Sequence, residues 1–233
     1  MENKTKTVSK LFACLMGVYI TCLLLSNLIA GKMMAVGTVT LPAAVILFPV
    51  TYILGDVFTE IYGYQKMRTV IWMGFGCSAF AVLIYLITIA LPHPDFWVNQ
   101  EAYKTVLSTT PRVFAASLAG YLFGEFSNSM ILSKLKVVTQ GKKLWIRTIL
   151  STIVGEAFDT VIFISISFFG TMDNKVLLQM MLYQYLFKVC YEVIFTPITY
   201  LVVNWLKKKE GIDTYDHDIK YRILFEKKKD KAE

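Results

Sequence analysis

Apolar stretches close to the length of a bilayer recur along this chain. Between positions 11 and 206 they are separated only by short polar loops. A helix needs about 20 apolar residues to cross the hydrocarbon core of a membrane. Of the 233 residues, 55% are hydrophobic and 18% are charged, whereas about 25% charged residues is usual in a soluble domain. The chain therefore needs lipid as a solvent for its surface, which predicts an all-α membrane protein.

The apolar stretches predict a bundle of six transmembrane helices. Their expected bounds are 11–31, 41–62, 69–91, 112–133, 146–170 and 177–206. The second stretch has the lowest hydropathy because it contains Pro42, Pro49 and two acids, and a re-entrant segment is the alternative. The chain then divides into an N-terminal leader (1–10), a transmembrane transport domain (11–206) and a basic tail (207–233).

The basic residues predict the orientation of the bundle. With both termini in the cytoplasm, most of the 24 Lys and Arg residues fall on the cytoplasmic side, as the positive-inside rule requires. We therefore expect a multi-pass protein of the cell inner membrane with its N-terminus inside. The net charge of +7 is explained by a Lys-rich tail lying against anionic lipid, so no nucleic-acid partner is expected.

Six carboxylates fall inside the predicted spans. They are Asp56, Glu60, Glu125, Glu156, Asp159 and Glu192. A carboxylate at bilayer depth is costly unless it faces the interior of the bundle, so such residues are functional candidates. Residues three or four apart share one face of a helix, and four spans each carry a polar stripe of this kind. The stripes also contain Tyr52, Tyr121, Asn128 and Lys188. Their convergence predicts a central cavity for a small-molecule substrate, with no cofactor.

Two of the stripes share a short pattern. Residues 124–128 and 155–159 both read G-E-x-x-[N/D]. The glycine allows another helix or a ligand to approach closely, and the acid with its partner three residues later forms a two-point acceptor site. A chance similarity is the alternative interpretation.

A purely structural role for the acids is the main alternative to a binding site. In that interpretation they pair with Lys188 and Arg112 to hold helices together, and Lys188 with Glu192 forms a pair on one helix face. Six acids against two cations leave a negative excess that must be protonated, hydrated or matched by a cation on a ligand. The two histidines, His93 and His217, lie in a loop and in the tail, so neither an enzyme nor a metal site is expected.

Residues 55–64, with the sequence GDVFTEIYGY, and the following Arg68 carry a family resemblance. Supporting elements are Ser26-Asn27 with Lys32, Arg112 with Ser117, and Arg147 ahead of Ser151-Thr152 and Asp159-Thr160. The chain resembles the queuosine precursor transporter family, also described as the vitamin uptake transporter family. The resemblance implies a six-helix inner-membrane importer of 7-deazaguanine precursors of a tRNA nucleoside, namely preQ0, preQ1 or queuine, and it adds Asn27 to the substrate-binding candidates.

The chain departs from the family pattern at two acids. The pattern often has Gln-x-x-Asp where Glu125-x-x-Asn128 stands, and Gln in place of Glu156. Extra negative charge favours the cationic aminomethyl groups of queuine and preQ1 over the neutral nitrile of preQ0. We expect alternating access around a midplane site, with Tyr52, Tyr121 or Phe158 stacking on the base.

The energy source and the partners are left open by the sequence. A proton carried on Asp159 or Glu60 and facilitated diffusion are both compatible with it. The alternatives in function are a substrate-binding subunit of an ATP-driven vitamin importer and a small-molecule channel. A homodimer formed through Gly74 and Gly76 is an alternative to packing of those glycines within one protomer.

Overall fold

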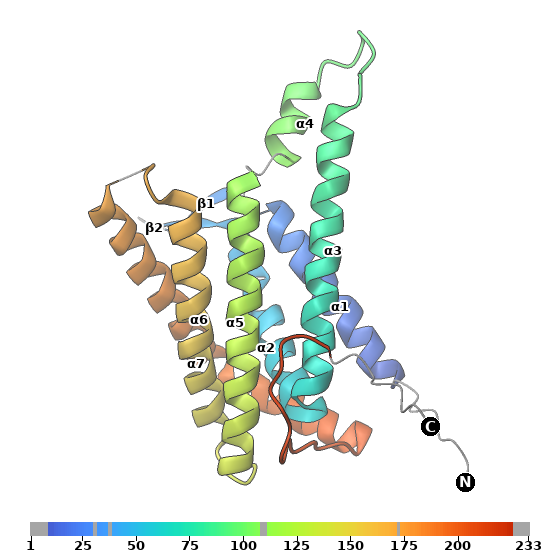
Figure 1. The fold of residues 1–233 in the computed structure, drawn as a ribbon, viewed down its shortest axis with the longest axis vertical. Helices are drawn as coiled ribbons and strands as arrows, with labels where there is room; N and C mark the ends of the chain where they lie inside the picture. Colours follow the sequence, from blue (N-terminus) through green and yellow to red (C-terminus); the bar gives the residue numbers. More distant parts are fainter. Residues whose placement is uncertain (1–8, 30–31, 37–38, 108–110, 172, 226–233) are drawn as a thin grey trace, which may run out of the picture.

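The protein is a bundle of long helices with one short β-hairpin (Figure 1). The computed structural model describes residues 9–29, 32–36, 39–107, 111–171 and 173–225. The predicted leader up to residue 8 and the tail beyond residue 225 lie outside the described residues.

The elements follow one another along the chain with short connections. They are α1 (Lys10–Ile29), β1 (Met33–Val36), β2 (Val39–Pro42), η1 (Ala43–Ile46), α2 (Phe48–Val57), η2 (Phe58–Tyr62), α3 (Tyr64–Ala90), α4 (Gln100–Leu107), α5 (Pro111–Val138), α6 (Leu144–Phe168) and α7 (Asn174–Glu210). β1 and β2 pair antiparallel, with Met33 opposite Pro42. η1 is a single 3₁₀ turn and η2 is a π-helix.

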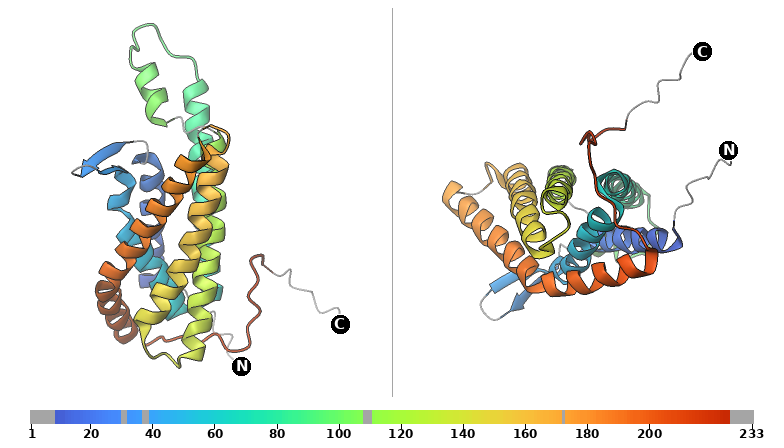
Figure 2. Two further views of the ribbon diagram at one scale, coloured as in Figure 1. Left: turned by 90° about the vertical axis from the view of Figure 1, so that its left-hand side faces the viewer. Right: turned by 90° about the horizontal axis from the view of Figure 1, so that it is seen from below.

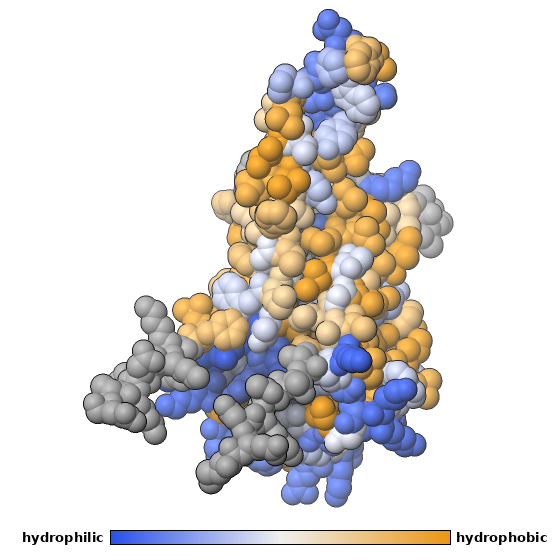
Figure 3. All heavy atoms as spheres, turned by 90° about the vertical axis from the view of Figure 1, so that its right-hand side faces the viewer, coloured by the Kyte–Doolittle hydropathy of each residue, from blue (hydrophilic) through white to orange (hydrophobic). Residues whose placement is uncertain are grey.

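Four helices within the described residues, α1, α3, α6 and α7, are long and apolar enough to cross a membrane. The 28-residue α5 is about 42 Å long at 1.5 Å per residue, but charged residues such as Glu125 and Lys136 interrupt its apolar sequence. On the face seen in Figure 3, apolar side chains cover the middle of the molecule and hydrophilic side chains gather at its lower end. The prediction of a helical membrane protein is therefore confirmed. The count of six crossings and the orientation of the termini stay predictions.

The predicted second span, 41–62, is not one straight helix. It begins in the last residues of β2, passes through η1, and continues as α2 and the π-helical η2. Pro49 occupies the first turn of α2, where a residue without a backbone N–H is tolerated. π-helical segments are rare and are frequent at functional sites. The segment that carries Asp56 and Glu60 therefore changes from an α-helix to a π-helix between these two residues.

The long α7 reaches from one end of the bundle to the other. Figure 2 shows it running past α6 and across the end of the molecule where α1 begins. We call this end, at which α1 begins and α7 ends, the terminal end. There Ser9 Oγ donates a hydrogen bond of 2.8 Å to Glu210 Oε1. The N-terminal and C-terminal helices are thereby joined at one end of the bundle.

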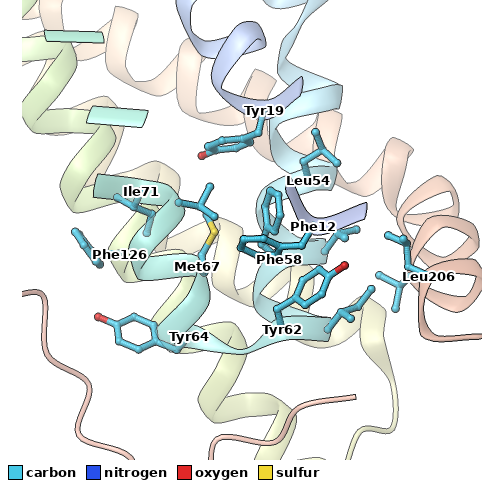
Figure 4. Packing of buried hydrophobic residues seen from close by; sticks show 14 of the residues in the cluster. Phe12, Tyr19, Leu54, Phe58, Tyr62, Tyr64, Met67, Ile71, Phe126 and Leu206 are labelled. Atoms are coloured by element: carbon cyan, nitrogen blue, oxygen red, sulfur yellow. The ribbon is translucent and has the colours of Figure 1, made fainter. Parts of the chain in front are cut away.

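An aromatic core fills the terminal end between α1, η2 and α3 (Figure 4). The ring of Phe12 packs edge-to-face against the rings of Phe58 and Tyr62, with centroids 5.3 and 4.8 Å apart. Tyr19 packs on Phe58 in the same way, at 5.9 Å. Edge-to-face packing of this kind adds to the free energy gained by burial, so this core anchors η2 between the two apolar helices.

Gly74 and Gly76 differ in their surroundings. A Cβ on Gly74 would lie 2.6 Å from Tyr121 Oη and 2.8 Å from Leu23 Cδ1, whereas one on Gly76 would meet nothing within 4 Å. Gly74 therefore serves packing within the protomer. A homodimer stays a prediction.

The segment 211–225, which we call the docked tail, folds back over the terminal end. Thr214 N donates to Ile61 O at 3.0 Å, and Asp216 Oδ2 accepts from Tyr64 N at 2.8 Å and from Ser133 Oγ at 2.5 Å. Farther along, Trp72 Nε1 donates to Ile223 O at 2.9 Å. The docked tail therefore packs on η2, α3 and α5, and lipid contact of the Lys-rich segments stays a prediction.

Gly63, in the turn between η2 and α3, lies against the docked tail in a backbone conformation that favours glycine. Gly63 has a φ of 82°, in the left-handed region that glycine tolerates best. A Cβ there would also lie 2.9 Å from Asp216 Oδ1 and 2.9 Å from Thr214 Cγ2. The turn between η2 and α3 thus has both the backbone shape and the free space that the docked tail needs.

Replacing Asp216 by Ala should release the docked tail. The variant loses the acceptor of two hydrogen bonds, and bonds to a charged group contribute about 1.5–3 kcal/mol each. Amide hydrogen exchange over residues 211–225 should become faster, and trypsin should cleave at Arg222 sooner. The matched control is Lys220→Ala, which alters an exposed tail side chain. Equal protection in both variants would show that Asp216 does not hold the tail.

Candidate functional site

The two G-E-x-x-[N/D] motifs meet where α5 packs on α6. A Cβ on Gly124 would lie 2.9 Å from the Cβ of Asp159, and one on Gly155 would lie 2.8 Å from the Cβ of Asn128. Each glycine therefore contacts the last residue of the other motif. The close approach of the two helices that the pattern predicts is confirmed. As a result, Glu125 of one motif and Glu156 of the other lie within electrostatic range of each other.

Glu60 belongs to a charge cluster at the terminal end, separate from these motifs. Arg147 donates from Nε to Glu60 Oε2 at 2.9 Å and from Nη2 to Glu60 Oε1 at 2.7 Å. Lys207 Nζ donates to Glu60 Oε1 at 2.7 Å. The bidentate geometry is the strongest form of an Arg–carboxylate pair. Both carboxylate oxygens of Glu60, which is fully buried, are therefore occupied by cations of the chain itself.

Two further residues, Lys136 and Asp213, complete this terminal charge cluster. Lys136 Nζ donates to the Glu60 carbonyl and to the Asp213 carboxylate, and Lys207 Nζ lies 2.9 Å from Asp213 Oδ1. Burial raises the pKa of Asp213, but hydrogen bonds from Lys136 and Lys207 outweigh that effect and hold the pKa below its usual value. The stability that Asp213 contributes is therefore present above its usual pKa and is lost as the pH falls through the lowered one.

A second group of charges centres on Lys188 of α7. Its Nζ lies 2.7 Å from Glu156 Oε2 and also pairs with Asp159 Oδ2. Lys188 and Glu156 are buried, and Asp159 is partly exposed. A Lys188–Glu192 pair on one helix face belonged to the structural alternative for these acids, and the ion pairs recorded for Lys188 are with α6.

The remaining acids keep acceptor atoms without donors. Asn128 Nδ2 donates to Asp56 Oδ1 at 3.1 Å, which joins α5 to α2. The buried oxygen atoms of this region that have no hydrogen-bond partner among the described residues include Asp56 Oδ2, Asn128 Oδ1, Glu125 Oε2 and Glu192 Oε1. Buried polar atoms are normally satisfied, so these four indicate a place where a donor-rich molecule or protons are expected. We call them the open acceptors.

Tyrosines surround the acids. Tyr52 of α2 lies beside Glu156, and Tyr121 Oη donates to Ile71 O at 3.2 Å. Tyr19 of α1, which is fully buried, lies beside Glu125 and Tyr121. Phe158, one of the predicted stacking residues, is instead 48% exposed on the outer surface of α6.

Two polar residues of the spans lie apart from this group. Asn27 of α1 is exposed and accepts a hydrogen bond of 3.4 Å from Ser117 Oγ. Arg112 donates to the carbonyls of Ile166 and Phe169 and so caps the C-terminal end of α6, where cations are favoured. No ion pair between Arg112 and a membrane carboxylate is recorded within the part of the chain that the structure describes.

The sequence did not predict which cations bind Glu60, nor that Tyr19 lies beside Glu125. Arg147, Lys136 and Lys207 were assigned to cytoplasmic loops or to the tail, where the positive-inside rule explained them. The rule that a buried carboxylate needs a cation could have directed attention to them. Within the described residues, no group of three or more His, Cys, Asp or Glu side chains is placed to hold a metal ion.

Polar and charged side chains gathered in the interior of a multi-helix membrane protein are typical of transporters, in which they mark a substrate or ion pathway. The family model described as "Putative vitamin uptake transporter" matches residues 42–202. The chain belongs to this family, which consists of transporters and not of enzymes. The matched range contains the open acceptors and three residues of the terminal charge cluster, Glu60, Lys136 and Arg147. Lys207 and Asp213 of that cluster lie beyond it.

Curated relatives agree with the family. The chain is 25% identical over 166 residues to the "Probable queuosine precursor transporter" of Bacillus subtilis, covering 71% of this chain and 72% of that protein. It is 25% identical over 166 residues to the "Queuosine precursor transporter" of Escherichia coli, covering 70% and 72%. A Haemophilus influenzae relative is 26% identical over 168 residues, covering 70% and 68%. No solved structure matches the chain.

Replacing Gly155 by Ala should destabilise the bundle. The added Cβ would lie 2.9 Å from the Gly124 carbonyl oxygen as well as against Asn128, and a backbone atom cannot move away cheaply. Overpacking of this kind costs about 1–3 kcal/mol, which should lower the thermal unfolding midpoint of the purified protein in detergent. The control Gly76→Ala enters open space and should leave the midpoint unchanged or slightly higher. Equal midpoints in the two variants would contradict the packing.

Replacing Glu60 by Gln should cost about 3–5 kcal/mol of stability, because it leaves Arg147 and Lys207 without their counter-ion. The double variant Glu60→Gln with Arg147→Met should regain part of that loss, since it removes one uncompensated cation. Thermal unfolding measures both, with Glu101→Gln in the exposed α4 as the control. A Glu60→Gln variant of normal stability would contradict a structural role for this pair.

Proposed function

We propose that this chain imports queuosine precursors across the cell inner membrane, crossing it six times with both termini in the cytoplasm. The relatives from Bacillus subtilis, Escherichia coli and Haemophilus influenzae, each described as a queuosine precursor transporter or a probable one, support the substrate class. The observation that carries the proposal within the molecule is the set of open acceptors, because a 7-deazaguanine base offers an N–H and an exocyclic amine side by side. A substrate of that kind supplies the donors that these buried oxygens need.

The base-binding residues in this proposal lie on α5 and α2. Glu125 is the acceptor best placed to take two adjacent donors, because its Oε2 has no partner among the described residues and its helix packs closely on α6. A carboxylate can accept two N–H groups at once, which adds geometric specificity. Asn128 Oδ1 provides a further acceptor, and Tyr52 is the proposed aromatic surface for the flat ring.

The charge of this interior favours a cationic substrate. Glu60 is matched by Arg147 and Lys207, and Glu156 and Asp159 share Lys188. No salt bridge to Glu125 is recorded among the described residues. The aminomethyl group of preQ1 or queuine would supply a positive charge there, and the nitrile of preQ0 would not. We therefore propose that queuine or preQ1 is preferred.

The alternatives to a self-sufficient transporter predict different results in ligand-binding and uptake measurements. A substrate-binding subunit of an ATP-driven importer would bind the ligand and transport it only with its energising partner. A channel or a purely structural protein would show no ligand-dependent stabilisation. Uptake by the purified chain in liposomes, with no other protein present, would exclude a subunit that needs an energising partner, and ligand-dependent stabilisation of the same protein would exclude a channel or a structural protein.

Thermal stability with added ligand tests the substrate. Purified protein in detergent should be stabilised by preQ1 or queuine, because a ligand that binds the folded state at a hundredfold excess over Kd adds about 2.7 kcal/mol. Biotin and guanine serve as ligand controls. Stabilisation by biotin, with no effect of any deazaguanine, would keep the membrane fold and overturn the substrate assignment.

The Glu125→Gln variant tests the origin of the preference. Wild type should bind preQ1 about tenfold more tightly than preQ0, equivalent to about 1.4 kcal/mol, and the variant should lose most of that difference. The matched control Glu101→Gln changes an exposed acid in α4 and should keep it. A variant that discriminates as well as wild type would show that the charge of Glu125 does not select the amine.

A further inference from the structure

Asp56 on α2 and Glu192 on α7 form a second kind of acidic site. Asp56 and Glu192 are each 2% exposed, and α2 packs directly on α7. Among the groups that interact electrostatically with Asp56, Glu192 contributes the largest effect. Asp56 Oδ2 and Glu192 Oε1 both lack a hydrogen-bond partner among the described residues. Two buried carboxyl groups therefore lie within electrostatic range of each other.

The surroundings of this pair supply more negative charge, and Lys188, one turn before Glu192 on α7, forms its recorded ion pairs with Glu156 and Asp159. Asp56 is also faced by Glu125 and Asn128 of α5 and by Glu60 of η2. Glu192 is faced by Glu156 of α6. From α1, Tyr19 lies beside Glu125. No salt bridge to Asp56 or Glu192 is recorded among the described residues, since Lys188 pairs with Glu156 and Asp159.

Two ionised carboxylates in such a place would be unstable. Burial removes their hydration, and like charges close together disfavour each other's ionisation. One proton shared between the two groups removes one charge and also supplies a donor to an oxygen that lacks one. The acids that the sequence offered as proton carriers, Asp159 and Glu60, differ in this respect because each forms an ion pair, with Lys188 and with Arg147 respectively.

Both helices that carry the pair have irregular backbones near it. Asp56 lies two positions before the first residue of the π-helical η2, and Pro197 lies inside α7, five positions beyond Glu192. A proline within a helix removes the hydrogen bond to the carbonyl four residues earlier, here that of Val193. Bending of α7 at Pro197 therefore breaks fewer backbone hydrogen bonds than bending of a regular helix would.

We propose that the Asp56–Glu192 pair is a proton-binding site that couples substrate import to proton entry. This inference rests on the proposed function, because it concerns the energy source of the same transport. One proton binds the pair from the outer side together with a substrate molecule, and the same proton leaves to the cytoplasm after the substrate. The pair returns to its starting charge, so no other reactant is consumed.

The first test uses the wild-type chain in liposomes with labelled preQ1 as the probe. The membrane potential is held at zero, and the interior is made one pH unit more alkaline than the exterior. One proton per substrate should then drive up to about tenfold accumulation, since one pH unit corresponds to 1.36 kcal/mol. Exchange of labelled for unlabelled preQ1 without a gradient is measured in parallel.

The two measurements separate the inference from the proposed function. Exchange together with gradient-driven accumulation supports both. Exchange with no effect of the gradient overturns proton coupling and leaves the transporter proposal in place. Neither exchange nor binding of preQ1 overturns the transporter proposal, and the coupling inference with it.

The second test assigns the site. The Glu192→Gln variant should lose the response of preQ1 uptake to the pH gradient, so that accumulation falls about tenfold to the equilibrium level expected without coupling. The control Glu101→Gln should accumulate preQ1 as wild type does. A Glu192→Gln protein that still accumulates preQ1 in response to the gradient would overturn the assignment.

A chemical measurement on the wild-type protein covers the case in which the variant does not fold. Dicyclohexylcarbodiimide reacts with protonated carboxyl groups in apolar surroundings, and the modified residue is located by mass spectrometry. Label should appear on Asp56 or Glu192, decrease as the pH rises, and be absent from the ion-paired Glu60 and Asp159. Label confined to other carboxyl groups would overturn the assignment.

Discussion

The cost of placing a carboxylate in a low-dielectric interior is the constraint on which this structure depends. Two arrangements that meet this cost coexist. At the terminal end, Glu60 is held by Arg147 and Lys207. Farther into the bundle, Glu156 and Asp159 share Lys188. The open acceptors have neither arrangement among the described residues, and this difference separates a structural region from a candidate functional one.

Backbone features position these charges as much as side-chain chemistry does. The paired glycines of α5 and α6 bring Glu125 and Glu156 near each other, because a Cβ at either glycine would collide with the other helix. The π-helix η2 and the left-handed Gly63 turn the chain so that Glu60 faces the cations and the docked tail meets the bundle. Small residues allow close packing of membrane helices, and here that packing also sets the distances between ionisable groups.

The terminal charge cluster and the docked tail form a connected unit. Lys136 contacts both Glu60 and Asp213, and the tail residues that follow Asp213 bond to η2, α3 and α5. In the proposed function this unit lies on the cytoplasmic side of the membrane. The substrate-binding acids and the proposed proton site lie beyond it within the bundle, so chain stability and substrate selection depend on different sets of carboxylates.

The sequence alone determined that the chain is helical, that it needs a membrane, and that several carboxylates, among them Asp56, Glu60 and Glu192, lie within its apolar segments. Those conclusions follow from hydropathy and helical spacing, which are local properties. Only the tertiary structure decided the partners: Glu60 binds Lys207, 147 positions away, and Lys188 pairs with α6 carboxylates although Glu192 lies one turn along its own helix. Partner choice depends on the tilt, rotation and separation of packed helices, and residue spacing along one helix does not encode these.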